Sequence, residues 1–213
     1  MANCCRARDY ERIFGRRTAA KDAKRYRRRG LTGTARALAD LAGDVRGESV
    51  LDVGGGIGAI ELELLAAGAT RATNVEISTE YEDAAKELLM ERGLEQRVER
   101  RIGDFVTDAE LVEPHDVVVM HRVVCCYPDA DALVGAAATH ARRRLLLTYP
   151  QERVLVRLGV RTIDAVLRVM RSEFRVYVHP VERMVSTAQK HGLSLDTRVR
   201  HGLFWESAAF ARA

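Results

Sequence analysis

Four glycines fall within the five residues 54–58, GGGIG, and they join two segments of different pattern. The apolar run SVLDV (49–53) before them is typical of a buried strand. The segment IGAIELELLAAG (57–68) after them is typical of a helix that ends at Gly68. A glycine-rich turn from a strand into a helix lets the backbone approach a ligand closely. This junction therefore predicts a strand–turn–helix unit with a ligand site at the turn.

Strand and helix patterns alternate through the centre of the chain. We expect strands at 49–53, 72–77, within 98–105, at 116–120 and at 144–150, and helices at 57–68, 80–93 and 129–141. The segment 193–212 reads as two strands around His201-Gly202, which indicates an antiparallel hairpin. Together these patterns predict an α/β fold: a Rossmann-like, doubly wound, mostly parallel seven-stranded sheet with an antiparallel C-terminal hairpin.

Charge is spread unevenly along the chain. Residues 1–30 hold eleven Lys and Arg against three Asp and Glu, a balance of +8, and the remainder balances at −4. Such a basic arm is compatible with binding to nucleic acid or to an acidic small molecule, and equally with a solvated helix face. There is no run of 18 apolar residues, and the charged start MANCCRARDYERIF lacks the apolar centre of a signal peptide. We therefore expect no membrane span and a cytoplasmic location.

The four cysteines form two adjacent pairs, Cys4-Cys5 and Cys125-Cys126. Neither pair has the CxxC spacing of a zinc site or of a redox motif. We expect free thiols and no metal site.

The glycine segment also satisfies the looser dinucleotide-binding fingerprint, through Gly54, Gly56 and Ala59 with Glu76 a little over twenty residues further on. An NAD-dependent oxidoreductase is therefore one candidate. Asp52 argues against it, because a dinucleotide fold normally keeps an apolar residue at that strand position. A buried carboxylate needs a donor, and a cofactor that carries a cation beside the loop would supply one.

Four segments follow one another in register: VLDVGGGIG (50–58), NVEIS (74–78), GDF (103–105) and DVVVMHRVVCCYPD (116–129). The 24 residues from Asp52 to Glu76 and the 28 from Glu76 to Asp104 each leave room for one helix–strand unit. In this order the segments resemble the motifs of the class I S-adenosylmethionine-dependent methyltransferases. The resemblance covers about residues 45–150.

The resemblance implies S-adenosyl-L-methionine as the cofactor. It places Glu76 at the two ribose hydroxyls, Asp104 at the exocyclic amine of adenine, and Phe105 near the adenine ring. Ile77, which follows Glu76, is a further expected cofactor contact. A cis-diol favours a bidentate carboxylate, and adenine needs one acceptor and an apolar face. The remaining expected cofactor contacts are Asp52, Gly54, Gly55, Gly56, Gly58, His121 and, from the N-terminal helix, Tyr26.

Methyl transfer from a sulfonium is an in-line displacement, so the protein must mainly align the acceptor with the methyl carbon. A general base helps only when the acceptor has a proton to lose. His121, at the carboxyl end of the fourth strand, is the first candidate base, and a hydrogen bond to the cofactor or backbone is its alternative role. His179 is the second candidate, with a capping or solvent-facing role as its alternative. Tyr127 either orients an acceptor or packs.

The chain is thus expected to be one methyltransferase domain, 1–213. Residues 1–44 would form an N-terminal helical cap, 45–150 the cofactor-binding core, and 151–213 a substrate-side helix (153–172) with the antiparallel strands. The tail and the CYP turn (126–128) are diffusely similar to the Mg-protoporphyrin methyltransferase branch, which methylates a carboxylate. We expect a small-molecule acceptor with an oxygen nucleophile, either a carboxylate or a hydroxyl, and a homodimer is one candidate assembly.

Three alternatives remain at this point: an RNA or other nucleic-acid methyltransferase that uses the basic arm, the NAD-dependent oxidoreductase, and a cofactor-binding protein without catalysis. The residues HRVV after the fourth strand differ from the [DNS]PP[YFW] motif of amino-methylating nucleic-acid enzymes, and no recognised nucleic-acid module is present. Nucleic acid is therefore the less favoured partner.

Overall fold

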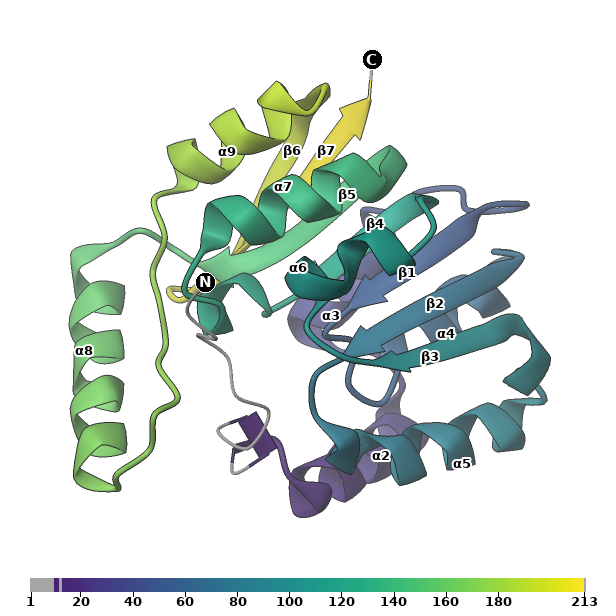
Figure 1. The fold of residues 1–213 in the computed structure, drawn as a ribbon, viewed down its shortest axis with the longest axis horizontal. Coiled ribbons are helices and arrows are strands. Elements are labelled where there is room, and N and C mark those ends of the chain that lie inside the picture. The colour runs from purple at the N-terminus through teal and green to yellow at the C-terminus, as the bar shows by residue number, and fades with distance from the viewer. Residues whose placement is uncertain (1–9, 12, 213) are drawn as a thin grey trace.

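The computed structural model describes residues 10–11 and 13–212. In this part of the chain a seven-stranded sheet runs in the order β3-β2-β1-β4-β5-β7-β6 (Figure 1). Its strands are β1 (Ser49–Val53), β2 (Arg71–Glu76), β3 (Val98–Ile102), β4 (His115–His121), β5 (Ala141–Pro150), β6 (Leu193–His201) and β7 (Trp205–Arg212). β1 to β5 pair in parallel, and β7 pairs antiparallel with both β5 and β6. The expected Rossmann-like sheet with an antiparallel end is confirmed.

Helices cover both faces of this sheet: α2 (Arg16–Arg29), α3 (Gly33–Asp40), α4 (Ala59–Ala66), α5 (Glu82–Arg92), α6 (Phe105–Asp108), α7 (Ala130–His140) and α9 (Val181–Lys190). A further helix, α8 (Val154–Val169), lies outside these two layers. Short 3₁₀ turns lie at η1 (Thr79–Tyr81), η2 (Glu95–Arg97), η3 (Ala109–Leu111) and η4 (Val124–Cys126). The helix expected from residue 57 begins at Ala59, because Gly58 has a φ of 78° and lies outside the right-handed helical region.

The core consists of two apolar layers, one on each face of the sheet. Successive side chains of a strand point to opposite faces, so neighbouring residues separate into the two layers. One layer packs under α6, α7 and α9 and includes Leu51, Val118 and Leu145. The other packs under α2, α3, α4 and α5 and includes Val50, Val117 and Leu146. Asp52 shares the second face with Val50, since the two residues are two positions apart on β1.

The strand order reverses at β1, which has β2 on one side and β4 on the other. The helices that follow β1 and β4 therefore lie on opposite faces. At such a switch point a crevice opens at the carboxyl ends of the strands, where ligands of this kind of sheet bind.

The basic helix α2 packs alongside α5 (Figure 1). Arg27 pairs with Glu87 and Glu91 of α5, and the side chain of Arg16 lies 3.1 Å from that of Asp83. The basic N-terminal segment thus meets acidic groups of the body on the described part of this surface. Residues 1–9, which include Cys4 and Cys5, lie outside the described residues.

α8 lies beside the carboxyl-end edge of the sheet rather than on one of its two faces (Figure 1). It buries Val156 and Leu167 and leaves Leu155, Ile163 and Val166 exposed. Within residues 10–11 and 13–212, no helix is long and apolar enough to cross a membrane. The same residues contain no group of three His, Cys, Asp or Glu side chains placed to hold a metal ion.

Candidate cofactor and acceptor site

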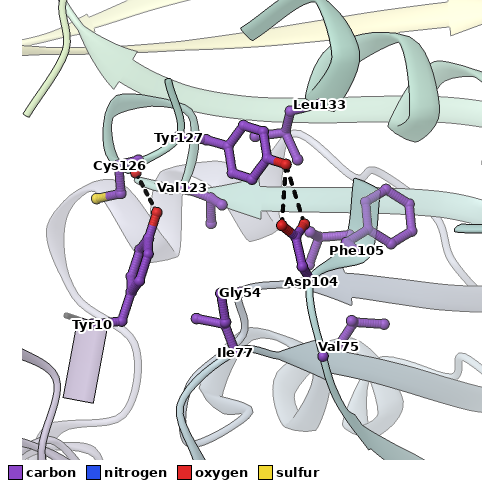
Figure 2. A pocket seen from close by; sticks show the side chains of 12 residues that line it. Tyr10, Gly54, Val75, Ile77, Asp104, Phe105, Val123, Cys126, Tyr127 and Leu133 are labelled. Carbon is purple, nitrogen blue, oxygen red and sulfur yellow. Dashed lines mark hydrogen bonds between the residues drawn. The ribbon is translucent and has the colours of Figure 1, made fainter. Parts of the chain in front are cut away.

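An open cavity lies at the carboxyl ends of β1 to β4, and the space between its walls, open solvent included, is about 390 Å³ (Figure 2). The described residues that line it are mostly apolar: Tyr10, Val53, Gly54, Val75, Ile77, Gly103, Asp104, Phe105, Val123, Cys126, Tyr127 and Leu133. Gly54, Ile77, Asp104, Phe105 and Tyr127 were expected at the site from the sequence. The crevice at the switch point of the sheet is therefore an apolar pocket.

Asp104 supplies the one carboxylate among the described lining residues. It follows β3 and caps α6, because its side chain accepts a hydrogen bond from the backbone N–H of Val106 at 3.0 Å. The hydroxyl of Tyr127 reaches the same carboxylate from the opposite side of the cavity (Figure 2). A carboxylate offers lone pairs for about four hydrogen bonds, so Asp104 can also accept an N–H from a ligand.

Glu76 ends β2 next to the cavity and is 7% exposed. Its two carboxylate oxygens accept the backbone N–H groups of Gly56 and Ser78, each at 2.9 Å. Burial raises the pKa of Glu76, and these two hydrogen bonds oppose that rise. The bonds also fix the carboxylate between the glycine loop and the turn after β2. Each oxygen keeps a lone pair for another donor.

The glycines of the loop are required by the protein's own packing. A Cβ on Gly54, whose φ is 65°, would lie 2.6 Å from a methyl carbon of Val123. A Cβ on Gly55 would lie 2.3 Å from the amide nitrogen of Asn74 and 2.7 Å from the carboxylate of Asp52. The sequence suggested that the loop makes room for a ligand. The structure adds that it makes room for polar side chains beneath it.

Asp52 belongs to a buried polar cluster under the loop, with Glu61, Asn74 and Arg100. It is 1% exposed, and neither carboxylate oxygen has a hydrogen-bond partner among the described residues. Burial raises the pKa of Asp52 well above its usual range; Glu61 raises it further, and Arg100 opposes the rise. We expected a cofactor cation beside Asp52. The cation in the structure is the Arg100 guanidinium, and Asp52 is not among the residues that line the cavity.

Tyr10 and Cys126 also line the cavity, and neither residue was expected there from the sequence. The Tyr10 hydroxyl donates to the backbone carbonyl of Cys126 at 2.6 Å (Figure 2). The Tyr10 ring also packs edge-on against Phe174, and so does the ring of Phe14. The signal available in the sequence was an aromatic residue in a basic arm, and Tyr26 fitted that description equally well.

A family model described as "Methyltransferase domain" matches residues 23–206, which is most of the chain. The chain belongs to this methyltransferase family. The family and the fold confirm the expected class I S-adenosylmethionine-dependent methyltransferase. The NAD-dependent oxidoreductase is set aside, because the glycine loop is part of the matched methyltransferase domain.

Solved structures with this fold act on varied acceptors. The magnesium protoporphyrin IX methyltransferase of Synechocystis PCC 6803, with bound SAH, has 19% identity and a TM-score of 0.65, over 97% of this chain and 86% of its own. An O-methyltransferase family 2 protein of Planctomyces limnophilus DSM 3776, in complex with apigenin, has 19% identity and a TM-score of 0.69, over 92% and 62%. The geranyl diphosphate C-methyltransferase of Streptomyces coelicolor A3(2) has 13% identity and a TM-score of 0.67, over 84% and 77%. No protein of curated function matches the sequence.

In this methyltransferase His121 ends β4 but is bound to the protein itself. Its Nε2 lies 2.9 Å from the hydroxyl oxygen of Thr34, which also accepts a hydrogen bond from Arg122 at 2.9 Å. The Arg122 bond occupies one lone pair of the Thr34 oxygen and leaves the Thr34 hydrogen available to Nε2, an arrangement that would place the proton of the neutral ring on Nδ1. Burial, and secondly the Arg122 charge, lower the pKa of His121 to about 3. His121 is therefore a neutral and weakly basic imidazole at physiological pH.

Arg122, the next residue, has a φ of 61°, a left-handed conformation that a non-glycine side chain rarely adopts. Its guanidinium lies over the ring of Trp205, 4.4 Å from the ring centroid. Left-handed strain of this kind often occurs at functional sites. Here it directs the chain from β4 into η4, whose last residue lines the cavity.

His179 lies in the extended segment between α8 and α9 and points to the loop after β4. Its Nε2 donates to the backbone carbonyl of Tyr127 at 2.9 Å, and its ring stacks on that of Tyr177. Because Nε2 carries the donated proton, Nδ1 is the basic nitrogen of the neutral ring. His179 is thus brought next to the cavity lining, although it is not itself among the lining residues.

Tyr26 is not at the cavity. It is 3% exposed on the inner side of α2, and its hydroxyl donates to Glu63 of α4 at 2.8 Å. Burial raises the pKa of this hydroxyl, so the phenol stays protonated. The expected cofactor contact at Tyr26 is replaced by a packing role, and Tyr10 takes the place at the cavity.

Proposed function

We propose that this methyltransferase transfers the methyl group of S-adenosylmethionine to an oxygen of a small-molecule acceptor, and that this oxygen belongs to a carboxylate. The observation that supports the cofactor's position most strongly is the apolar cavity. The Asp104 carboxylate lies at one side of this cavity, and the Glu76 carboxylate lies next to the cavity at the end of β2. The acceptor is inferred from the state of the candidate bases.

The residues present fit the cofactor. Ile77, Phe105 and Leu133 offer apolar surface for adenine, and Asp104 offers an acceptor for its exocyclic amine. Glu76 offers the charged acceptor that a ribose diol requires. When bound, the cofactor supplies an activated methyl group on a sulfonium. The chain would hold it through Asp104 and Glu76 and exclude water with the apolar lining.

His121 is too weak a base to remove a proton from the acceptor's nucleophile. Its imidazole has a pKa of about 3, and its basic nitrogen is bonded to Thr34. A hydroxyl acceptor has a proton to lose and benefits from a base, whereas a carboxylate is already ionised at pH 7. The chain's task is then to position the acceptor and exclude water. For a hydroxyl acceptor, His179 through Nδ1 would be the candidate base.

A nucleic-acid acceptor has less support. In α2, the arginines Arg16, Arg25 and Arg27 pair with acidic residues of η1, α2 and α5. The other basic residues of this helix are exposed: Arg17, Lys21, Lys24, Arg28 and Arg29. Exposed apolar side chains of α8, including Leu155 and Leu158, lie at the carboxyl-end edge and suit an apolar small molecule better than a phosphate backbone.

Calorimetric titration of the full chain with S-adenosylhomocysteine and, separately, with NAD tests the cofactor. We expect micromolar binding of the first and none of the second; binding of NAD alone would contradict the proposal. The acceptor is tested with paired libraries of small carboxylic acids and their primary amides, with release of S-adenosylhomocysteine as the readout. Turnover of acids but not of amides is expected. Turnover confined to phenols or alcohols would favour the hydroxyl alternative.

A further inference from the structure

Two adjacent thiols lie at the wall of the cavity. Cys125 and Cys126 end the turn η4, and their sulfur atoms are 3.7 Å apart. Both thiols are free; Cys125 is buried, and Cys126 is half-buried and lines the cavity. The proposed methyl transfer uses neither sulfur.

The backbone of η4 and of the residue after it binds two segments that are distant from it in the chain. Three successive carbonyls each accept one hydrogen bond. The carbonyl of Cys125 accepts the backbone N–H of Tyr177 at 2.7 Å, and that of Cys126 accepts the Tyr10 hydroxyl at 2.6 Å. The Tyr127 carbonyl accepts from His179 at 2.9 Å. The N-terminal segment and the segment before α9 are therefore both attached to η4.

We propose that Cys125 and Cys126 form a redox-active dithiol site that reacts with a low-molecular-weight disulfide, and that the resulting Cys125–Cys126 disulfide loosens the N-terminal segment, whose Tyr10 lines the cavity, and the segment before α9 from η4. The expected effect on ligand affinity rests on the proposed function, because it is measured as binding of S-adenosylhomocysteine in the cavity. The expected formation of the disulfide is independent of the proposed function.

The chemistry balances in two exchange steps. The thiolate of Cys126, the more accessible sulfur, attacks a disulfide RSSR; a protein–SR bond forms, the S–S bond of RSSR breaks, and one RS⁻ leaves and takes up a proton. The thiolate of Cys125 then attacks the Cys126 sulfur and expels the second RS⁻, which is also protonated. In total, two protein thiols are oxidised to one disulfide and RSSR is reduced to two RSH.

The surroundings of Cys125 suit the second step. The hydrogen bond from Cys126 lowers the pKa of the Cys125 thiol, and the Arg122 charge lowers it further. A thiolate is the attacking species in disulfide exchange. Once Cys126 is in the mixed disulfide it has no S–H to donate, and the Arg122 charge is the contribution that still favours the Cys125 thiolate. In the reduced protein the hydrogen bond to Cys125 and burial raise the pKa of Cys126, so the first step should be faster at alkaline pH.

A disulfide between neighbouring residues must distort the turn that contains it. Consecutive Cα atoms are about 3.8 Å apart across a trans peptide, whereas disulfide-bonded residues usually have Cα atoms about 4.4–6.8 Å apart. Such a bond is strained and easily reduced, which is typical of reversible rather than structural disulfides. Because η4 is a single 3₁₀ turn, the distortion reaches its own carbonyls, to which Tyr10 and Tyr177 are bonded, and the adjoining Tyr127 carbonyl, to which His179 is bonded.

The test uses the full chain with Cys4 and Cys5 replaced by Ser, so that Cys125 and Cys126 are the remaining thiols. After treatment with oxidised glutathione, we expect intact-protein mass spectrometry to show the loss of two hydrogens and no retained glutathione. Peptide mapping should place the bond between residues 125 and 126. S-adenosylhomocysteine should bind the oxidised protein at least tenfold more weakly, and dithiothreitol should restore the affinity.

Two variants in the same background separate the steps. Cys125→Ser should retain one glutathione on Cys126, because the resolving thiol is missing. Cys126→Ser should remain unmodified, because its remaining thiol is buried. A stable glutathione adduct on the parent, or no reaction at all, would overturn the dithiol site. A disulfide that forms without changing S-adenosylhomocysteine affinity would overturn the proposed effect of the disulfide on the segments that contain Tyr10, Tyr177 and His179. If the reduced parent fails to bind S-adenosylhomocysteine, the proposed function fails while the mass measurement still tests the dithiol.

Discussion

The hydroxyl of Tyr127 donates to the Asp104 carboxylate, 3.3 Å from Oδ1 and 3.2 Å from Oδ2. Asp104 follows β3 and Tyr127 follows β4, and β2 and β1 lie between these strands in the sheet. The bond therefore spans the cavity above the glycine loop and joins the two sides of the switch point (Figure 2). It fixes the carboxylate that we assign to adenine.

We expect Tyr127→Phe to weaken S-adenosylhomocysteine binding by roughly 2- to 10-fold, the value of one hydrogen bond of about 0.5–1.5 kcal/mol. The physical reason is that Asp104 loses the contact that orients it. Calorimetric titration measures the change. Tyr26→Phe is the matched control, because Tyr26 is bonded to Glu63 away from the cavity, and its affinity should equal that of the parent. Tighter binding by Tyr127→Phe would mean that the hydroxyl competes with the ligand.

We expect Glu76→Ala to weaken S-adenosylhomocysteine binding by roughly 10- to 100-fold, since hydrogen bonds to a charged group contribute about 1.5–3 kcal/mol. Glu76 also holds the N–H groups of Gly56 and Ser78, so some loss of stability should accompany the effect. Titration calorimetry measures the loss of affinity, and a thermal melt measures the loss of stability. Glu99→Ala, an exposed carboxylate on β3, serves as the control. Unchanged affinity in Glu76→Ala would remove Glu76 from the ribose site.

Gly55→Ala should destabilise the protein by about 1–3 kcal/mol, because the added Cβ would overlap Asn74 and Asp52. Gly159→Ala, within α8, should instead stabilise it by about 0.5–1 kcal/mol, since no atom lies within 4 Å of the added carbon and alanine favours a helix. Urea unfolding of both variants measures these free energies. Equal effects at the two positions would contradict the assigned role of Gly55.

Asp52→Asn should stabilise the unliganded protein at neutral pH. Well below the usual aspartate pKa of 3.8 the carboxyl is protonated in both the folded and the unfolded chain, so its burial costs no ionisation energy. Above that pH the unfolded chain ionises while the buried carboxyl keeps its proton, and the folded state loses stability until the pH passes the raised pKa. The stability gap between variant and parent should widen steadily from about pH 4 towards the raised pKa of Asp52. A gap that is constant with pH would show that Asp52 is ionised in the folded protein.

His121 should stay neutral throughout the physiological range, because burial lowers its pKa to about 3. Nitrogen chemical shifts of the imidazoles, followed from pH 8 to pH 5, should show one ring that keeps its proton on Nδ1 and does not titrate. Its signals are assigned by their loss in His121→Gln. A midpoint near the ordinary histidine value of 6.5 would restore His121 as a candidate base.

The order of strands and helices could be read from the sequence, and so could the position of Glu76 and Asp104, the carboxylates that we assign to the cofactor. Glu76 and Asp104 each come directly at or after the end of a strand, and parallel strands bring their carboxyl ends to one edge. Local pattern alone was sufficient for this inference. The sequence also predicted a loop next to the cavity after β4, which contains Tyr127.

The tertiary structure decided which distant residues meet these elements. Tyr10 rather than Tyr26 reaches the cavity, because α2 turns Tyr26 inward against Glu63. Arg100 lies on β3, which β2 separates from β1, and its positive charge opposes the rise in the pKa of buried Asp52. The neutral state of His121 depends on Thr34, which is 87 positions away in the chain. Hydrogen bonding and burial across such separations depend on how the layers pack, which local sequence pattern does not encode.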